Sequence, residues 1–406
     1  MMQSRALHYF AQLHTFVDSA IDQGIFGGAV FFVKREGDWI LHGAKGSLSV
    51  DSDEAPMDED IIFDVASLTK VLVTTPAIML LQEAGELSID DPVADYIESF
   101  RDTEKLCITI KDLLTHSSGL PAWAPLYVFA DDKDEAIEFI SHIPLRYTPG
   151  EEIEYSCLGF ILLGRIVELV SGQDIAEFAR GHIFEPLGLR QTFFRPPREL
   201  LSRIAPTEHG NVYEQAKAAQ FIEEFSTVAS QDRWLASRLR RAKRRLDSMR
   251  REGLIRGQVH DSNAYFLGGV SGNAGVFSCA SDVMKMAEQF LPGASGRKRN
   301  AILSPESVRQ MITPQKEVGN QCRGLGWQLI KGNGTSGGRL ISRSAFGHTG
   351  FTGCSLWIDP LRELAVVLLS NAVCPRYKPD GMAAFRPAFH DLVVQFSDCI
   401  FSPAHA

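Results

Sequence analysis

The chain has 406 residues, of which 45% are hydrophobic and 22% charged, and its formal net charge is −9 at pH 7. This length allows a large core and favours two closely joined subdomains, while the acidic balance argues against a general nucleic-acid-binding protein. Seven cysteines show no paired spacing, so they indicate reduced thiols in a reducing compartment and not a disulfide scaffold.

The first predicted elements are a helix and a hairpin. Apolar residues between Phe10 and Ile21 recur at helical spacing. Segments 28–34 and 39–43 are typical of strands, and the polar turn 35–38 joins them. The start of the chain does not have the pattern of a secretory signal, and no apolar run approaches the ~20 residues that span a membrane. We therefore expect a cytoplasmic protein without membrane contact.

A long apolar run follows the tetrapeptide Ser67-Leu68-Thr69-Lys70. A helix that begins here brings the Ser67 hydroxyl and the Lys70 amine onto one face, at the positive helix end. Partial burial is expected to lower the lysine pKa and provide a neutral amine as a base. These are the parts of an activated nucleophile, although Ser-x-x-Lys also occurs by chance on ordinary helices.

From residue 67 to about 291 the pattern is mainly helical. Segment 233–256 is strongly basic, and its apolar residues recur at three- and four-residue steps, which predicts an amphipathic helix. Such a helix could bind an acidic partner or nucleic acid. Because the whole chain is acidic, we favour a solvated helix that packs by its apolar face.

Strand patterns return at 339–346, 353–358 and 364–369, and an amphipathic helix is predicted over 383–401. Strands at both ends with helices between them predict an α+β fold with an antiparallel sheet. Residues 1–65 plus 292–406 would form the sheet subdomain, and 66–291 a mainly helical subdomain. The active site would lie in the cleft between the two.

Further motifs accompany the serine–lysine pair. Segment 113–121 ends a predicted helix in a Gly/Pro turn, Tyr155 precedes an apolar helix, and the triplet at 348–350 ends a strand. In this order and spacing they resemble the serine β-lactamase and penicillin-binding-protein superfamily, above all its class C-like branch of esterases and D,D-peptidases. The resemblance extends from about Gly27 to Ser370 and includes 259–264 and 268–278.

The resemblance implies an acyl-enzyme mechanism. Ser67 would be the nucleophile, and Lys70 would accept its proton or keep Tyr155 deprotonated. Tyr155 would activate the deacylating water and protonate the leaving group. The backbone N–H groups of Ser67 and Phe351 would form the oxyanion hole. The expected substrate contacts are His348, Thr349, Gly350 and Cys157, with Gly350 on an edge strand where the substrate can approach the backbone closely.

Two positions depart from the family pattern. Cys157 stands where the family has asparagine, and a thiol is a weak hydrogen-bond partner. His348 replaces a lysine and would be only partly charged near neutral pH. Both changes favour simple esters over amides and β-lactams. Cys157 could be a redox-sensitive thiol, but a small, buried, inert cysteine is more common.

The sequence therefore predicts a serine hydrolase of a small acyl substrate, most readily a carboxylic ester. The alternative within enzymes is a β-lactamase or an amide hydrolase of the D,D-peptidase or D-aminopeptidase type. The alternative of another class is a catalytically weak, penicillin-recognising sensor or binding module. No motif indicates a metal ion, a nucleotide or another cofactor.

Overall fold

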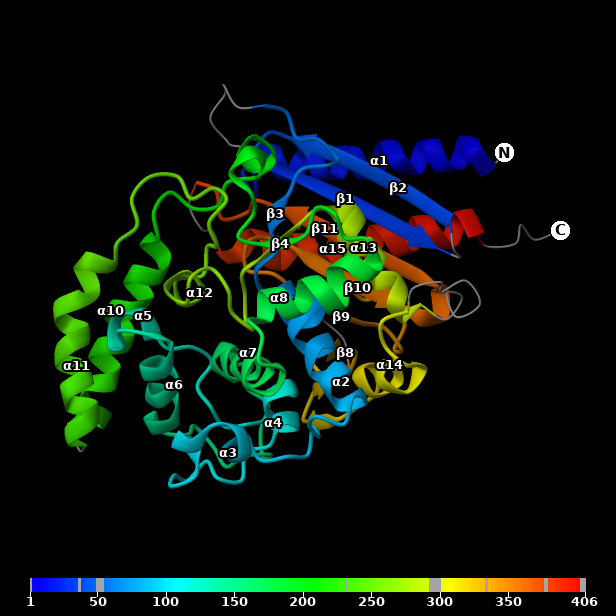
Figure 1. Cartoon of the computed structure of the whole chain (residues 1–406). Helices are drawn as coiled ribbons and strands as arrows, with labels where there is room; N and C mark the ends of the chain where they lie inside the picture. Colours follow the sequence, from blue (N-terminus) through cyan, green and yellow to red (C-terminus); the bar gives the residue numbers. More distant parts are fainter. Residues whose placement is uncertain are drawn as a thin grey trace.

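The computed structural model describes residues 2–35, 38–48, 55–230, 232–291, 301–332, 335–375 and 379–401. Figure 1 shows the sheet with α1 and α15 in one part of the molecule and most of the short helices in another. The α-helices are α1 (Met2–Asp22), α2 (Thr75–Glu83), α3 (Val93–Tyr96), α4 (Ile110–Leu114), α5 (Leu126–Phe129), α6 (Lys133–His142), α7 (Cys157–Ser171), α8 (Ile175–Ala179), α9 (Glu185–Leu187), α10 (Val212–Ala229), α11 (Arg233–Arg245), α12 (Ser262–Phe266), α13 (Ala280–Ala287), α14 (Pro305–Ile312) and α15 (Pro379–Phe401).

The strands form two sheets. The larger has the order β2-β1-β11-β10-β9-β8-β7-β6, and the smaller has the order β3-β5-β4. The strands are β1 (Gly28–Arg35), β2 (Asp38–Gly46), β3 (Phe63–Asp64), β4 (Phe193–Phe194), β5 (Val276–Ser278), β6 (Lys316–Val318), β7 (Gln321–Arg323), β8 (Gln328–Leu329), β9 (Phe346–Thr349), β10 (Ser355–Asp359) and β11 (Leu364–Ser370).

The large sheet is antiparallel and joins the two ends of the chain, as predicted. Strand β1 pairs with β11 from Ala29 opposite Ser370 to Arg35 opposite Leu364. The Asn371 side chain reinforces this pairing, since its Oδ1 accepts a 2.9 Å hydrogen bond from the Gly28 backbone N–H. The early strands and the late strands therefore fold as one unit.

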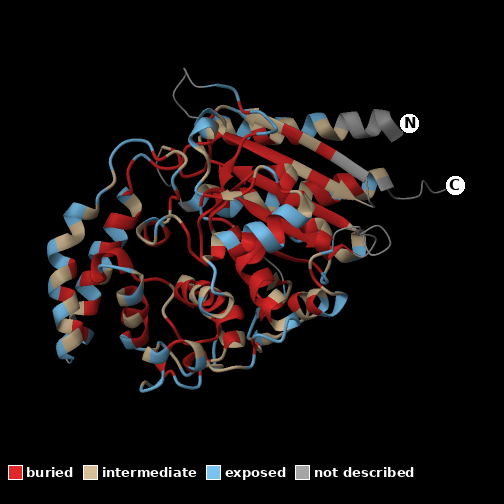
Figure 2. Ribbon diagram, in the orientation of Figure 1, coloured by how far each residue is buried: buried red, intermediate tan, exposed pale blue. Residues whose placement is uncertain are grey.

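The central strands are buried on both faces (Figure 2). In β11, Val366 and Leu368 belong to a core with α1 and α15, whereas Val367 and Leu369 belong to the larger core that includes α2, α7 and α13. Side chains alternate between the faces of a strand, so a continuous apolar run such as Leu364–Ser370 is the sequence expected of a strand covered on both faces.

Most predicted elements of the sheet are confirmed, and two differences stand out. The strand predicted over 339–346 is wrong, because the only strand there begins at Phe346. Strands β6 to β8 are too short to give a sequence pattern. The hairpin around 35–38 forms, although residues 36 and 37 lie outside the described residues. The division into two subdomains, with its boundary near 292, stays a prediction.

The basic segment forms a helix, but only in its first half. Helix α11 ends at Arg245 and a 3₁₀ turn covers Leu246–Met249. Its apolar side chains Leu235 and Leu239 are buried. Figure 1 shows α10 and α11 side by side at the edge of the molecule. None of the described helices has the length and apolar character that crossing a membrane requires.

Candidate active site

The tetrapeptide containing Ser67 begins with tight and irregular helical turns. Ala66 has a positive φ of 47° and opens a 3₁₀ turn over Ala66–Leu68. A π-turn over Lys70–Thr74 then leads into α2. The proline at position 76 has no N–H to continue the regular α-helical pattern, which favours this wider turn. Ser67 therefore lies at the start of an irregular helix and not of a regular one.

Lys70 is fully buried beside the serine. Its Nζ lies 3.0 Å from the Ser67 Oγ and donates to the Asn273 carbonyl oxygen at 2.8 Å. Burial opposes the charged amine, but the Cys157 thiol and the Tyr155 hydroxyl favour it, and the net pKa of Lys70 is raised. The expected lowering of this pKa is therefore wrong, and the raised pKa keeps Lys70 an ammonium ion at neutral pH.

Tyr155 faces Lys70 from the start of α7. The Ser156 side chain caps this helix by accepting from the Gly159 N–H at 3.3 Å, as serine commonly does. The Lys70 Nζ lies 5.0 Å from the centre of the Tyr155 ring. Burial raises the pKa of Tyr155, whereas Lys70 and Ser67 act to lower it, and the net change is upward. The raised pKa therefore makes the neutral phenol the main form of Tyr155 at neutral pH.

Cys157 is the first residue of α7 and is partly exposed. Its Sγ lies 3.6 Å from the Lys70 Nζ, so the thiol contacts the same ammonium group as the Ser67 hydroxyl. The structure thus places Cys157 within the cluster that the sequence predicted. No disulfide joins any cysteines that the structure describes.

His348 and Thr349 end strand β9 on the other wall. The expectation of an edge strand is wrong, because β9 lies between β8 and β10. However, the pairing with β8 stops at Gly347, so His348 and Thr349 project past the end of that neighbour. Burial, together with Lys70 and Arg323, lowers the pKa of His348 to about 3. The expected partial charge is therefore also wrong, and the imidazole is neutral.

Position 350 must be glycine because neighbouring atoms of the protein leave no space for a Cβ. A Cβ at this position would lie 2.5 Å from the Val65 carbonyl oxygen and 3.1 Å from the Cys354 Cβ. Such contacts are too short for any side chain, so only glycine lets the end of β9 approach the turn that carries Ser67. This approach brings Phe351 to the same cleft, and Phe351 is 37% exposed.

A cavity of about 400 Å³ contains these groups. The predicted residues that line it are Ser67, Tyr155, Cys157, His348, Thr349 and Phe351. The residues that sequence reasoning did not assign are Ala66, Ala122, Trp123, Tyr213, Glu214, Lys217, His260, Asp261, Arg323 and Gln328. His260 and Asp261 lie in segment 259–264, which is part of the resemblance to the superfamily. Arg323 and Glu214 gave no sequence signal.

Arg323, at the end of β7, brings a positive charge to the cleft. Burial lowers the pKa of its guanidinium, and Tyr155 opposes this lowering. Within the described residues the guanidinium makes no hydrogen bond or ion pair. A partly buried cation without a protein partner can bind an anionic group of a ligand.

The opposite wall of the cleft is acidic. Burial, assisted by Asp261, raises the pKa of Glu214 to about 7. Behind it, the His260 Nε2 lies 3.0 Å from the Glu208 Oε2, and both side chains are buried. The His260 backbone N–H donates to the Asp64 Oδ2 at 2.7 Å. These acidic groups therefore hold the segment that carries His260 and Asp261.

His116 supports Tyr155 from behind. Its ring centre lies 4.6 Å from that of Tyr155, and its Nδ1 accepts from the Ser156 backbone N–H at 3.1 Å. Burial keeps the pKa of His116 well below its usual value, so the ring is neutral. In the part of the chain that the structure describes, no three His, Cys, Asp or Glu side chains are grouped to hold a metal ion.

Known proteins are similar to this chain over most of its length. A β-lactamase family model matches residues 13–385. A protein of Escherichia coli O157:H7, provisionally named a D-alanyl-D-alanine carboxypeptidase, is 34% identical over 328 residues, which cover 76% of this chain and 69% of that protein. The N-acetylmuramyl-L-alanine amidase of Bacillus subtilis strain 168 is 29% identical over 383 residues, covering 87% and 80%.

Solved structures share the fold. EstCE1, described as a hydrolase with promiscuous acyltransferase activity, gives a TM-score of 0.70 at 21% identity and covers 95% of this chain and 99% of its own. A class C β-lactamase from Rhodobacter sphaeroides gives 0.68 at 22% identity, covering 94% and 98%. These similarities confirm the predicted α+β fold.

Proposed function

This chain belongs to the β-lactamase family of serine hydrolases, and from that premise we propose that it hydrolyses carboxylic esters through an acyl-enzyme on Ser67. The observation that carries the proposal is the 3.0 Å contact between the Ser67 Oγ and the Lys70 Nζ, inside a cavity that Tyr155 also lines. A nucleophile, a fixed cation and a phenol within one cleft are the groups that acyl transfer needs.

The proposed acylation step balances as follows. Tyr155 acts in its phenolate form, which the Lys70 ammonium stabilises. The Ser67 oxygen attacks the ester carbonyl carbon while the Ser67 proton passes to the Tyr155 oxygen. The tetrahedral oxyanion is held by the backbone N–H groups of Ser67 and Phe351. When the carbon–oxygen bond to the alcohol breaks, Tyr155 returns the proton to the leaving alcohol. The acyl group remains bonded to Ser67.

Deacylation uses the same groups with water as the nucleophile. Tyr155 takes a proton from water as the water oxygen attacks the acyl carbonyl carbon. The bond to Ser67 then breaks, the serine oxygen regains the proton, and the carboxylic acid leaves. Microscopic reversibility makes one residue both base and acid in the two half-reactions.

The character of the cleft supports an ester as the substrate. Amide and β-lactam groups need polar partners that both donate and accept hydrogen bonds, and Cys157 offers only a weakly polar thiol. Because His348 is neutral, it cannot form an ion pair with a substrate carboxylate. An ester also has a better leaving group than an amide, so its hydrolysis places smaller demands on the general acid.

A second candidate is the release of an amino acid from a peptide that ends in a free carboxylate. Arg323 favours it, because its guanidinium lies in the cleft and is unpaired among the described residues. The relatives named for carboxypeptidase activity also support it. In this candidate Arg323 would hold the terminal carboxylate, and Ser67 would attack the preceding carbonyl carbon.

The test compares substrates on the purified protein and on Ser67→Ala. Nitrophenyl acetate and butyrate should be hydrolysed with repeated turnover by the natural protein, faster than acyl-D-alanyl-D-alanine or a chromogenic cephalosporin. Ser67→Ala should lose at least about 10³-fold in kcat, since a nucleophile is removed. Faster release of D-alanine than of nitrophenol would establish the second candidate. A single burst without turnover would indicate a binding module instead.

A further inference from the structure

A second cavity lies beside the catalytic cleft. It has a volume of about 440 Å³ and shares Ala122, Trp123 and Lys217 with the cleft. The Lys217 Nζ lies 4.4 Å from the Trp123 ring centre, and this pair stands where the two cavities meet. A ligand that occupies both cavities must pass this pair.

Helix α10 forms one wall along the whole length of both cavities. Residues on successive turns face the hollow, at spacings of three and four positions, as one face of a helix requires. Those that line the cleft are Tyr213, Glu214 and Lys217, and those that line the second cavity are Lys217, Gln220, Phe221, Glu224, Phe225 and Val228. From Lys217 to Val228 the helix advances about 16 Å at 1.5 Å per residue.

The opposite wall consists of residues 121–123 and 143–146. Together with α10 it encloses what we name the α10 groove, which has a mainly apolar lining. The Trp123 and Phe221 rings meet edge to face, with centres 6.4 Å apart, and Val228 at the far end is 39% exposed. Trp123, Ile143 and Phe225 are buried, so the lining forms a partly covered apolar hollow, which is typical of a small-molecule site.

The groove offers few free backbone hydrogen-bond donors to a ligand, and its polar side chains are those of Arg146, Glu154, Lys217, Gln220 and Glu224. The backbone N–H of Leu145 donates to Glu104, that of Arg146 to the Gly119 carbonyl and that of Ala122 to Glu154. The N–H groups in the middle of α10 are used within the helix. An extended peptide needs main-chain partners along its length, whereas an aliphatic chain needs only apolar contact.

We propose that the α10 groove holds a long aliphatic acyl chain whose carbonyl carbon is attacked by Ser67. This inference rests on the proposed acyl-enzyme function and specifies its substrate class. The ester bond to the alcohol breaks as the acyl–Ser67 bond forms, and water then releases the fatty acid. The chain stays in the groove through both steps, while the small alcohol leaves from the cleft.

The first experiment measures kcat/KM for nitrophenyl acetate, butyrate, octanoate and dodecanoate below their aggregation concentrations. Each added methylene should raise kcat/KM, by up to about fourfold where it is fully buried. If dodecanoate is hydrolysed no faster than acetate, the acyl-chain inference fails. The ester hydrolase proposal still stands in that case, provided that acetate hydrolysis requires Ser67.

Two variants test the groove itself. Gln220→Glu places a charge in the lining one helical turn from Lys217, and Ala219→Glu places the same charge on the neighbouring exposed position, which does not line the groove. Gln220→Glu should lower kcat/KM for dodecanoate at least about tenfold without changing acetate hydrolysis, since a bound chain covers the new charge and burying a charge is costly. Ala219→Glu should change neither. Equal behaviour of the two variants would overturn the inference.

A binding measurement separates the chain from a peptide. Calorimetry with Ser67→Ala should detect binding of nitrophenyl dodecanoate, and the added change Gln220→Glu should weaken it. The same calorimetry with an acetylated pentapeptide should give no effect of Gln220→Glu. Weakening of the peptide alone would assign the groove to peptides and overturn the aliphatic-chain inference.

Discussion

The Cys157 sulfur lies 3.6 Å from the Lys70 ammonium nitrogen, at the position where the family pattern has an asparagine. Cys157→Asn should therefore add a donor and an acceptor beside the reacting carbonyl. A hydrogen bond contributes about 1 kcal/mol net, so kcat/KM for an amide or a cephalosporin should rise roughly fivefold. Cys157→Ala, which adds no amide, should give no increase. Equal rates for the two variants would place residue 157 outside the substrate path.

Tyr155 is the proposed proton carrier, and its raised pKa makes the phenolate scarce at neutral pH. The rate should therefore increase from neutral to alkaline pH, because the deprotonated form is the active one. Tyr155→Phe should lower kcat by about 10²- to 10⁴-fold and remove this increase. Tyr147→Phe is the control, since the Tyr147 hydroxyl bonds to loop backbone, including that of His116 and Glu154. A profile unchanged in Tyr155→Phe would exclude this role.

Arg323 should affect the binding of substrates that carry a free carboxylate, and not the rate of the chemical step. Hydrogen bonds to charged groups contribute about 1.5–3 kcal/mol, so Arg323→Gln should raise KM roughly tenfold or more for acyl substrates with a free carboxylate. KM for nitrophenyl acetate should stay the same. Steady-state kinetics on a matched pair, a monoester of a dicarboxylic acid and its neutral analogue, measures the difference. Equal losses on both members would contradict carboxylate binding.

The buried His260–Glu208 pair should make stability depend on pH. Burial opposes the charged imidazole, but Glu208, Glu214 and Asp64 together raise the pKa of His260 above 6.5. Its stabilisation is therefore complete below the unfolded value of about 6.5 and is lost as pH rises through the folded-state pKa. Breaking a buried pair costs about 3–5 kcal/mol, so Glu208→Gln should destabilise strongly in acid and less in alkali.

Urea unfolding across this pH range measures the effect of Glu208→Gln. The control is Glu59→Gln, which alters a partly exposed ion pair in which the Glu59 Oε2 lies 3.5 Å from the His42 Nδ1. Exposed pairs contribute about 0–1 kcal/mol, so this control should barely respond to pH. A loss in Glu208→Gln that is the same at all pH values would show that His260 is neutral in the folded protein.

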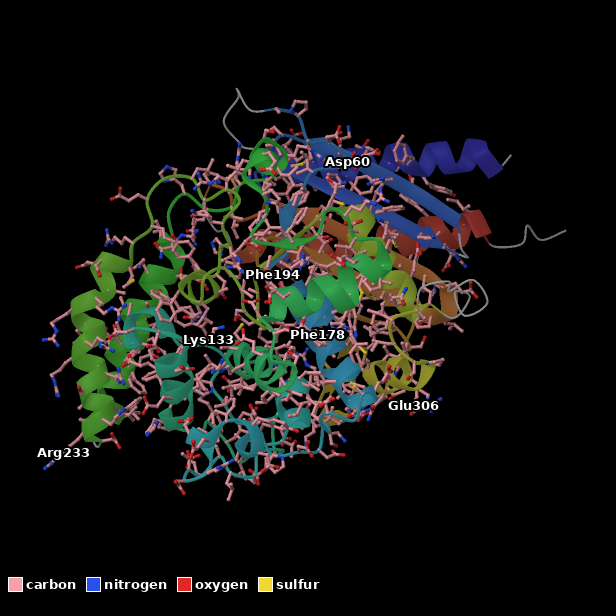
Figure 3. The ribbon with its side chains drawn as sticks, in the orientation of Figure 1. Asp60, Lys133, Phe178, Phe194, Arg233 and Glu306 are labelled. Atoms are coloured by element: carbon pink, nitrogen blue, oxygen red, sulfur yellow. The ribbon has the colours of Figure 1, made fainter. Side chains whose placement is uncertain are left out.

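The arginines of α11 should differ according to the side of the helix they occupy. The Arg241 Nη1 lies 2.7 Å from the Glu135 Oε2, and Arg241 also pairs with Asp131. Arg240 is exposed, and Figure 3 shows Arg233 projecting away from the body of the protein. Arg241→Ala should lower stability by about 0.5–1 kcal/mol, and Arg240→Ala by less than about 0.5 kcal/mol.

A helix α11 that packs against the protein by its apolar face should also have little affinity for nucleic acid. Electrophoretic mobility of duplex DNA should not change with the protein at physiological salt, since several of the helix's charges are already paired within the chain. Salt-sensitive binding that Arg240→Ala weakens would instead show that the outward face is an anion-binding surface.

The sequence predicted the parts of the fold that have strong periodic signals. Strand β11 and helix α15 were found because their apolar runs are long, and the meeting of β1 with β11 followed from the order of elements. Strands β6, β7 and β8 were not predicted, because two or three residues are too few to show an alternating apolar pattern. The predicted strand before Phe346 failed because an apolar pattern does not encode the turns found there.

The site residues that belong to a sequence motif could be predicted. The residues that only tertiary packing brings to the cleft could not. Ser67, Lys70 and Tyr155 were placed by their motifs, and the structure brings them together. Arg323 and Glu214 reach the cleft only through tertiary packing. The expected lowering of the Lys70 pKa and the expected partial charge of His348 were wrong, because both depend on neighbours distant in sequence.

The pairing of β1 with β11 has a consequence for the order in which the protein can mature. Gly28 and Asn371 are 343 residues apart, so a chain leaving the ribosome cannot close its central sheet until residue 371 has been made. Ser67, Tyr155 and strand β9 are synthesised at widely separated times. Contacts this distant in sequence slow folding and leave apolar strands uncovered in the meantime. Hydrolytic activity should therefore arise only after β11 has been made, and early strands such as β1 need protection from aggregation until then.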